Sequence, residues 1–114
     1  MNENFLYGAL WGIIFGILLA WGMPAHASDW SLMGKIVACE SSGRPYVWGD
    51  DHKSFGIAQF QYQTFKEMKR LAHMERLRWR NPGDQLTLMS WMLDHGYSNR
   101  WTCYRKLKKE GKLN

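Results

Sequence analysis

The sequence predicts one mainly α-helical domain of four or five short helices, with a small loop or β-hairpin insert after the first of them. Apolar residues recur at helical spacing in three stretches beyond residue 30. Glycine, proline and asparagine interrupt the chain between those stretches. Residues 44–54 follow the first stretch and contain turn formers without any period. A chain of 114 residues has room for one such domain.

Composition excludes several classes of protein. The chain is 46% hydrophobic and 15% aromatic, which is too apolar for a disordered tail. Its length leaves no room for a nucleotide-binding domain together with a substrate domain. Its mean hydropathy of −0.44 excludes a polytopic membrane protein.

The N-terminal residues have the pattern of an export signal. Residues 5–23 are uncharged, and about 20 apolar residues can cross a bilayer. Ala25 and Ala27 then fit the small-residue pattern of a signal-peptidase site, with cleavage after Ala27. The segment before the apolar run carries Glu3 and no Lys or Arg, which departs from a usual signal peptide. We therefore expect residues 1–27 to be a signal peptide or an N-terminal membrane anchor.

Residues 28–114 would then form an exported domain in the periplasm, the cell wall or the extracellular space, free or held at the membrane through residues 5–23. This domain carries all 15 basic residues and every acidic residue except Glu3, so its formal charge is +6. In an oxidising compartment its two cysteines, Cys39 and Cys103, predict a disulfide. Closing so long a loop would stabilise the fold by roughly 4 kcal/mol.

Zinc binding is the alternative use of the two cysteines. The chain has no Cys-x-x-Cys or His-x-x-x-His spacing to support it, and we predict neither a metal nor a cofactor. The histidines that would take part are His52, His73 and His95.

The first helix of the domain is predicted over residues 32–40. Its apolar stripe consists of Leu32, Met33, Ile36 and Val37, together with Glu40. Ser41-Ser42-Gly43 ends the helix, because Gly43 can take a left-handed cap and Pro45 blocks continuation. In the insert, Gly49-Asp50-Asp51 predicts a tight turn.

Two further helices follow the insert. Thr64 and Glu67 match a capping box, so a helix should run from Thr64 to about Trp79. Its inward residues are expected to be Phe65, Met68, Leu71 and Ala72. Asn-Pro-Gly at residues 81–83 breaks that helix, and Asp84 can cap the next one, which ends near Gly96. The inward residues of the next helix are expected to be Leu86, Met89 and Leu93.

A last, strongly basic helix is predicted from near Thr102. Its cations are Arg105, Lys106, Lys108, Lys109 and Lys112. A solvated face is one interpretation, and attraction to anionic wall polymers or lipid headgroups is another. Because the chain carries an export signal, we expect no nucleic-acid partner.

Glu40 is the first candidate for catalysis. It lies four residues after Ile36, so it falls on the apolar side of its helix, at the carboxyl end where the helix dipole disfavours negative charge. Desolvation and the dipole both raise a carboxyl pKa. A carboxyl that is still protonated near neutral pH suits a general acid that protonates a glycosidic oxygen. An ordinary surface glutamate at a frayed helix end is the alternative.

Residues 54–60 read Ser-Phe-Gly-Ile-Ala-Gln-Phe and form a candidate sugar-binding segment. Gly56 lets a ligand approach the backbone closely. Ser54 and Gln59 offer uncharged hydrogen-bonding groups beside aromatic rings, which suits the hydroxyl edge and C–H face of a sugar. By composition alone, the segment is equally a buried strand or turn.

Together these residues resemble a known family. Asp29-Trp30 precedes Ile-Val-Ala-Cys-Glu-Ser-Ser-Gly at residues 36–43, and the segment 54–60 is followed by Thr64-Phe65. This order resembles the lysozyme-like lytic transglycosylases, and within them the soluble-lytic-transglycosylase (SLT) and resuscitation-promoting-factor-like domains. The second group also has a cysteine before the glutamate and another near a late tryptophan, as Cys39 and Cys103 would be here. The resemblance covers about residues 29–103.

The resemblance implies an α+β lysozyme-like fold and cleavage of peptidoglycan glycan strands. Lytic transglycosylases break the β-1,4 bond between N-acetylmuramic acid (MurNAc) and N-acetylglucosamine (GlcNAc) without water. Glu40 would be the single acid/base, Ser54 would position the sugar N-acetyl group or the catalytic carboxyl, and Gln59 would contact the substrate. We expect a monomer.

Other candidates leave the reaction type open. Asp50 and Asp51 lie where lysozymes can carry a second carboxylate, and either one facing Glu40 would indicate a muramidase, whereas a solvated turn is the alternative. The family's Ala-Tyr-Asn segment is absent, and Tyr97 is only a loose counterpart. Candidates for stacking on sugar faces are Trp48, Tyr62, Trp91, Tyr97 and Trp101, of which Trp91 also fits the core. A non-catalytic glycan-binding module and an envelope assembly partner remain alternative functions.

Overall fold

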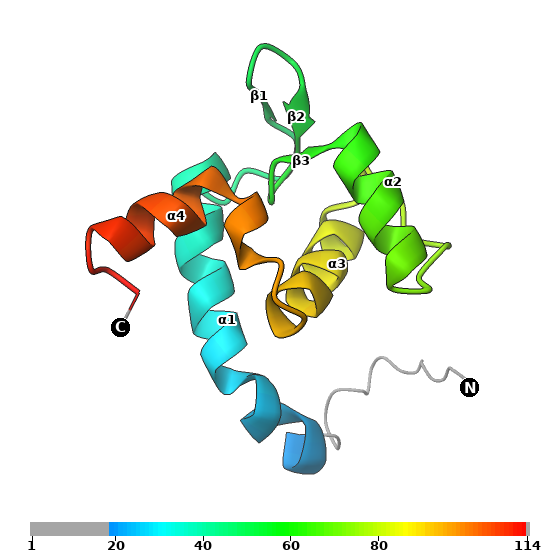
Figure 1. Ribbon diagram of the computed structural model, residues 1–114. Coiled ribbons are helices and arrows are strands. Elements are labelled where there is room, and N and C mark those ends of the chain that lie inside the picture. The colour runs from blue at the N-terminus through cyan, green and yellow to red at the C-terminus, as the bar shows by residue number, and fades with distance from the viewer. Residues whose placement is uncertain (1–18, 114) are drawn as a thin grey trace. The chain divides into compact units, whose positions relative to one another are not determined.

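The computed structural model describes residues 19–113, with side chains described from residue 30 onward. The elements follow the order α1, β1, β2, β3, α2, α3, a 3-10 turn η1 and α4 (Figure 1). By its contacts the chain divides after Trp30, and the unit that begins at Ser31 contains every element after α1. This unit is a small α+β domain, so the predicted mainly helical domain with a hairpin insert is confirmed.

Helix α1 spans Leu19–Ser41, so it begins well before the expected residue 32. Its end is where the sequence predicts it. Ser42 and Gly43 both take positive φ angles, of 58° and 77°, and the Gly43 N–H donates to the Ser41 hydroxyl. This left-handed turn sends the chain away from the helix axis directly after Glu40 and Ser41.

The predicted export segment is largely outside the described residues. Of the apolar run 5–23, only its last residues fall within α1, and cleavage after Ala27 stays a prediction. Over residues 19–113, no helix is both long and apolar enough to cross a membrane.

The insert is a β-hairpin followed by a third strand. Strands β1 (Trp48–Gly49), β2 (Ser54–Phe55) and β3 (Phe60–Gln61) form an antiparallel sheet in that order. Phe55 pairs with Trp48 on one side and with Phe60 on the other. Asp50 and Asp51 form the predicted tight turn with positive φ angles of 51° and 58°. In Figure 1 the β1–β2 hairpin projects away from the helices of the domain.

Helix α2 spans Tyr62–Leu71, and both of its predicted ends are wrong. The helix starts directly from β3, with Gln61 as N-cap and no side-chain cap, so the capping box at Thr64 is not used. It ends before residues 72–81, a loop that is held by the side chains of Trp79 and Lys69. The Trp79 indole N–H donates to the Phe60 carbonyl at 2.8 Å, and the Lys69 ammonium donates to the Glu75 and Leu77 carbonyls, each at 3.1 Å.

Helix α3 spans Pro82–Asp94, and its cap is Asn81 rather than the predicted Asp84. The Asn81 side chain accepts from the Asp84 N–H at 2.9 Å, and the Asp84 carboxylate accepts from the Arg78 N–H. The buried face of α3 is also rotated from the expected one. It consists of Gln85, Leu88, Met89 and Met92, while the predicted Leu86 and Leu93 are only partly buried.

The C-terminal part of the chain lies against the end of α1. The 3-10 turn η1 (Ser98–Arg100) leads into α4 (Thr102–Lys109), which starts at the predicted residue. The predicted disulfide is present: Cys39 of α1 is bonded to Cys103 of α4, with their Cα atoms 5.9 Å apart. This bond joins the residue before Glu40 to the first turn of α4.

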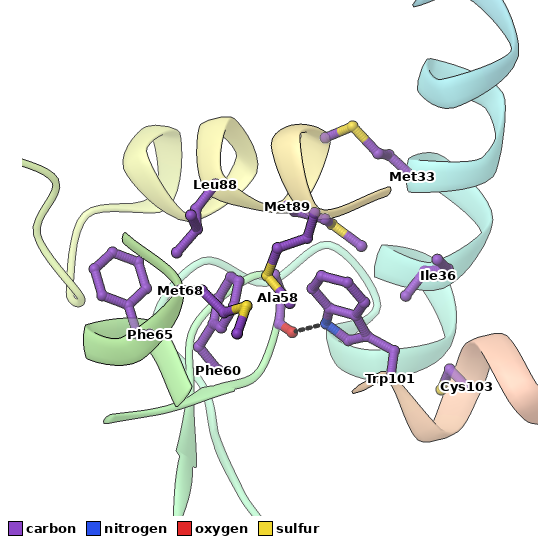
Figure 2. Packing of buried hydrophobic residues seen from close by; sticks show 11 residues of the cluster. Met33, Ile36, Ala58, Phe60, Phe65, Met68, Leu88, Met89, Trp101 and Cys103 are labelled. Carbon is purple, nitrogen blue, oxygen red and sulfur yellow. Dashed lines mark hydrogen bonds between the residues drawn. The ribbon is translucent and has the colours of Figure 1, made fainter. Parts of the chain in front are cut away.

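The hydrophobic core gathers side chains from all four helices and from the loop between β2 and β3 (Figure 2). Phe60 lies between Phe65 and Trp101, with ring centroids 5.3 and 5.5 Å away in edge-on contacts. Met68 and Phe65 are buried as predicted, whereas Leu71 is 47% exposed and was wrongly expected inside. The core therefore packs around the chain segment that follows the hairpin.

Candidate active site

Residues 56–59, here called the central loop, connect β2 to β3 and lie in the middle of the domain. Three different elements bind the backbone of this loop. The Ser41 hydroxyl donates to the Ile57 carbonyl at 2.8 Å, and the Trp101 indole N–H donates to the Ala58 carbonyl at 2.8 Å (Figure 2). The Gln85 side chain accepts from the Ala58 N–H at 2.9 Å. The loop is thus fixed by α1, α3 and the start of α4.

Gln85 is the polar centre of this arrangement. It is fully buried, and its amide N–H groups donate to the carbonyls of Phe55 and Trp79 at 2.8 and 2.7 Å. Gly56 passes directly over it with a φ of +92°, and a Cβ at that position would lie 2.4 Å from Gln85 Nε2. The glycine predicted to allow close approach of a ligand therefore allows close approach of a protein side chain instead.

A cleft of about 210 Å³ opens beside the central loop, and Glu40 lies in its wall. The sequence-predicted residues that line it are Glu40, Asp50, Ser54, Gln59 and Trp101. Its further polar lining comes from Gln61, Thr64, Arg100 and Thr102, and its further apolar lining from Phe60 and Met92. Uncharged hydrogen-bonding side chains thus surround a small number of charges, which suits a hydroxyl-rich ligand.

The Glu40 carboxyl is half-buried, and burial raises its pKa above the ordinary value of 4.5. The negative charge of Asp50 raises this pKa further. Two groups of the α4 region act in the opposite direction. The Cys103 N–H donates to Glu40 Oε2 at 3.2 Å, and the Arg105 guanidinium favours the carboxylate. Desolvation is the largest of these effects, so the net result is a carboxyl that keeps its proton to higher pH than a solvated glutamate.

Asp50 brings a second carboxylate into the same cleft. Its Oδ2 accepts from the Ser54 hydroxyl at 2.6 Å, and Ser54 is itself buried. Ser54 therefore orients Asp50 directly, and Asp50 acts on Glu40 through its charge. Asp51, the other candidate, is an exposed residue of the hairpin turn and is not part of the cleft lining.

Gln59 lines the cleft in a left-handed backbone conformation, with a φ of +52°. Both protons of its side-chain amide are used within the protein, because Nε2 donates to the carbonyls of Val47 and Gly56 at 3.0 Å each. Its Oε1 lies against Gly49, where a Cβ would be 2.1 Å away. Gln59 thus holds the base of the hairpin, and only its amide oxygen has capacity left for a ligand.

The other aromatic candidates lie outside the Glu40 cleft. Trp48 packs edge-on against Phe55 and Trp79, with ring centroids 4.8 and 5.8 Å away. Tyr62 is 50% exposed and belongs to a second hollow on the α2 side. Tyr97 stacks on Trp91 at 5.7 Å, in a cluster that packs against the core. Of the five aromatic candidates, only Trp101 lines the cleft, and its indole N–H is used by Ala58.

Several cleft residues carry no signal in the sequence. Arg100 and Thr102 are distant from Glu40 in the chain, and they reach the cleft because the disulfide holds the start of α4 against α1. Thr64 is predicted as a helix cap, and the sequence gives no prediction for Gln61. Only the chain path from β3 into α2 places their side chains in the cleft wall.

A scan against protein-family models and searches of curated proteins and solved structures find no match for this chain. Within residues 19–113, no cluster of three or more His, Cys, Asp or Glu side chains is arranged to hold a metal ion.

Proposed function

We propose that the domain is a peptidoglycan lytic transglycosylase that cleaves the MurNAc-β-1,4-GlcNAc bond, with Glu40 as general acid and then as base. The proposal rests mainly on one observation. A half-buried glutamate, with a pKa raised chiefly by burial, lines a cleft whose other side chains are mostly uncharged hydrogen-bonding groups. The α+β fold, in which the acid ends a helix and a hairpin follows, agrees with the lysozyme-like class that the sequence resembles.

The proposed reaction needs a single carboxyl group. Protonated Glu40 donates its proton to the glycosidic oxygen, the C1–O4 bond breaks, and positive charge develops at C1 of MurNAc. The resulting carboxylate accepts the proton of the C6 hydroxyl as O6 bonds to C1, which forms the 1,6-anhydro ring. Glu40 ends the cycle protonated, as it began. Its raised pKa serves the first step, and the Cys103 N–H stabilises the carboxylate present in the second.

A muramidase is the second candidate, and Asp50 is the observation that favours it. Its carboxylate lies in the same cleft and is oriented by Ser54, as expected for a group that acts on water or on the sugar. Asp50 then has two different possible roles. It is a reacting group in a hydrolase, whereas in a transglycosylase it only raises the pKa of Glu40.

The decisive experiment is mass spectrometry of fragments released from purified sacculi by the wild-type protein and by Glu40→Gln. Anhydro-ended fragments indicate transglycosylation, and reducing ends indicate hydrolysis. We expect anhydro ends, and a loss of release of about 10²–10⁴-fold in Glu40→Gln. Gln retains an acceptor for the Cys103 N–H, and Asp51→Asn, an exposed residue beside the cleft, is the matched control. Unchanged release by Glu40→Gln would discard the assignment.

Asp50→Asn separates the two enzymatic candidates. In a transglycosylase the variant keeps anhydro products, and the limb of its pH–rate profile that belongs to Glu40 moves to lower pH, because a neighbouring negative charge is gone. In a hydrolase the variant loses activity as severely as Glu40→Gln. Binding of glycan strands with no cleavage by the wild-type protein would instead indicate a non-catalytic wall-binding module.

A further inference from the structure

A second hollow is lined by α2 and by the loop that follows this helix. Its volume is about 360 Å³, which falls within the range of small-ligand sites. We call it the basic groove, because four of its lining residues are Lys66, Lys69, Arg70 and Arg78. Glu75 is the acidic residue in its lining, so the groove carries a clear excess of positive charge.

The cations of the groove are available for an external anion. Lys66 and Arg70 are exposed and lie four residues apart, on one face of α2. Among residues 30–113, no carboxylate forms an ion pair with Lys66, Arg70 or Arg78. Lys69 is different, because its ammonium already donates to two loop carbonyls and serves to hold the groove wall.

The groove also has an aromatic lining, which includes Tyr62 and Trp79. Tyr62 and Trp79 contact each other edge-on, with ring centroids 5.2 Å apart, and the Lys66 ammonium lies 6.0 Å from the Tyr62 ring. Tyr62 is half-exposed, so it offers a ring edge and a hydroxyl to a bound molecule. The groove thus combines a place for an apolar or C–H surface with several cations.

The groove and the cleft share a wall. Gln61 and Thr64 line the cleft, whereas Tyr62 and Lys66, which alternate with them along the chain, line the groove. A polymer bound in the cleft would therefore have its substituents within reach of the groove. In peptidoglycan those substituents are stem peptides, which carry free carboxylates.

We propose that the basic groove is a binding site for the carboxylate-bearing stem peptides of the glycan strand held in the Glu40 cleft. The inference rests on the proposed function, since it names the part of that substrate that the groove would take. Two observations support the inference: the groove has an excess of positive charge, and neighbouring residues of one segment line both the groove and the cleft. A nucleic acid would also suit cations beside aromatics, but the Cys39–Cys103 disulfide is typical of an oxidising compartment outside the cytosol, where nucleic acid is not the usual partner.

The test measures binding in the Glu40→Gln background, where the ligand stays intact. The probes are a MurNAc–GlcNAc tetrasaccharide with stem peptides, the same saccharide after removal of its peptides, and a short oligothymidylate. Each is titrated against Glu40→Gln and against the same protein carrying Lys66→Ala and Arg70→Ala. The matched control carries Lys108→Ala and Lys109→Ala, two exposed cations of α4 that line neither hollow.

We expect the peptide-bearing saccharide to bind about tenfold more tightly than the bare one, since each exposed cation contributes about threefold at low salt. The groove variant should lose this preference, and the α4 control should keep it. Added salt should weaken the preference in parallel. Equal binding of both saccharides, a preference that survives in the groove variant, or no binding of the peptide-bearing saccharide would overturn the inference. Tighter binding of the oligothymidylate would replace it with a nucleic-acid site.

The measured binding preference is independent of catalysis. If wild-type protein releases anhydro fragments but shows no peptide preference, the inference fails and the proposed function stands. If the preference is present and maps to the groove but no bond is cleaved, the proposed enzymatic activity fails and the groove assignment stands.

Discussion

Reduction of the Cys39–Cys103 disulfide should both destabilise the domain and raise the pKa of Glu40. The bond closes a loop with a sequence separation of 64 residues. The chain-entropy model gives a stabilisation of roughly 4 kcal/mol for a loop of that length. For a domain of this size, 1 kcal/mol moves the melting temperature by about 4–8 °C, so the reduced protein should melt about 15–30 °C lower.

The assay is thermal unfolding followed by circular dichroism, with and without a phosphine reductant. The control is the double variant Cys39→Ala/Cys103→Ala, whose melting temperature should already be low and should not respond to the reductant. A decrease of less than about 5 °C in the wild-type protein would refute the reasoning, since the unfolded chain would then gain little freedom from the broken bond.

A second effect of reduction reaches Glu40 through the α4 backbone. The Cys103 N–H lowers the pKa of Glu40 by donating to it, and the disulfide holds that N–H in place. At a temperature where the reduced protein stays folded, the pKa of Glu40 should therefore be higher than in the oxidised protein. An NMR titration of the Glu40 carboxyl in both redox states measures this directly, and a fall in pKa would contradict the geometry.

Three further predictions concern the acid and the central loop. Glu40 has a folded-state pKa above its unfolded value, so the free energy of unfolding falls as the pH rises through that pKa. Glu40→Gln should accordingly melt higher than the wild-type protein at pH 7 and equally at about pH 3.5, and a constant difference across that range would count against a raised pKa. Gln85→Met should cost about 3 kcal/mol in urea unfolding, because it leaves the Ala58 N–H and two carbonyls unpaired in the interior. Gly56→Ala should cost at least about 2 kcal/mol, since its Cβ would meet the Gln85 amide at a positive φ, and a neutral result would show that the loop can move.

Local features of the fold could be predicted from the sequence where short-range chemistry decides them. The end of α1 at Ser41-Ser42-Gly43 and the turn at Asp50–Asp51 follow from residues that favour left-handed backbone. The disulfide followed from the number of cysteines and the predicted export. In each case the deciding residues are neighbours in the chain or have one available partner.

Long-range contacts explain the errors. The capping box at Thr64 is not used, because the chain passes from β3 directly into α2 and the helix starts two residues earlier. The predicted extension of α2 to Trp79 failed because the Trp79 indole bonds to the Phe60 carbonyl, which requires a loop. The buried face of α3 was misplaced because Gln85 looks like a surface residue until the three backbone groups that it binds are known.

In the candidate site, too, local features could be predicted from the sequence and features that depend on long-range contacts could not. The position of Glu40 on the apolar side of its helix was predictable from its spacing to Ile36. The roles of Gln59 and Ser54 were not predictable from the sequence. The Gln59 amide donates to the Val47 carbonyl and the Ser54 hydroxyl donates to the Asp50 carboxylate, so these donors are not free for a ligand. Arg100 and Thr102 enter the cleft only through the fold of the whole domain.

The central loop is fastened by Ser41, Gln85 and Trp101, and this has a consequence for how the protein can evolve. The loop connects α1, α3 and the start of α4, so a mutation in it disturbs the packing of three helices before it changes what the cleft recognises. New selectivity should therefore arise at Gln61 and Thr64, which line the cleft and whose side chains make none of the hydrogen bonds that fix the loop. A mutational library would then show intolerance along residues 56–59 and broad tolerance at Gln61 and Thr64.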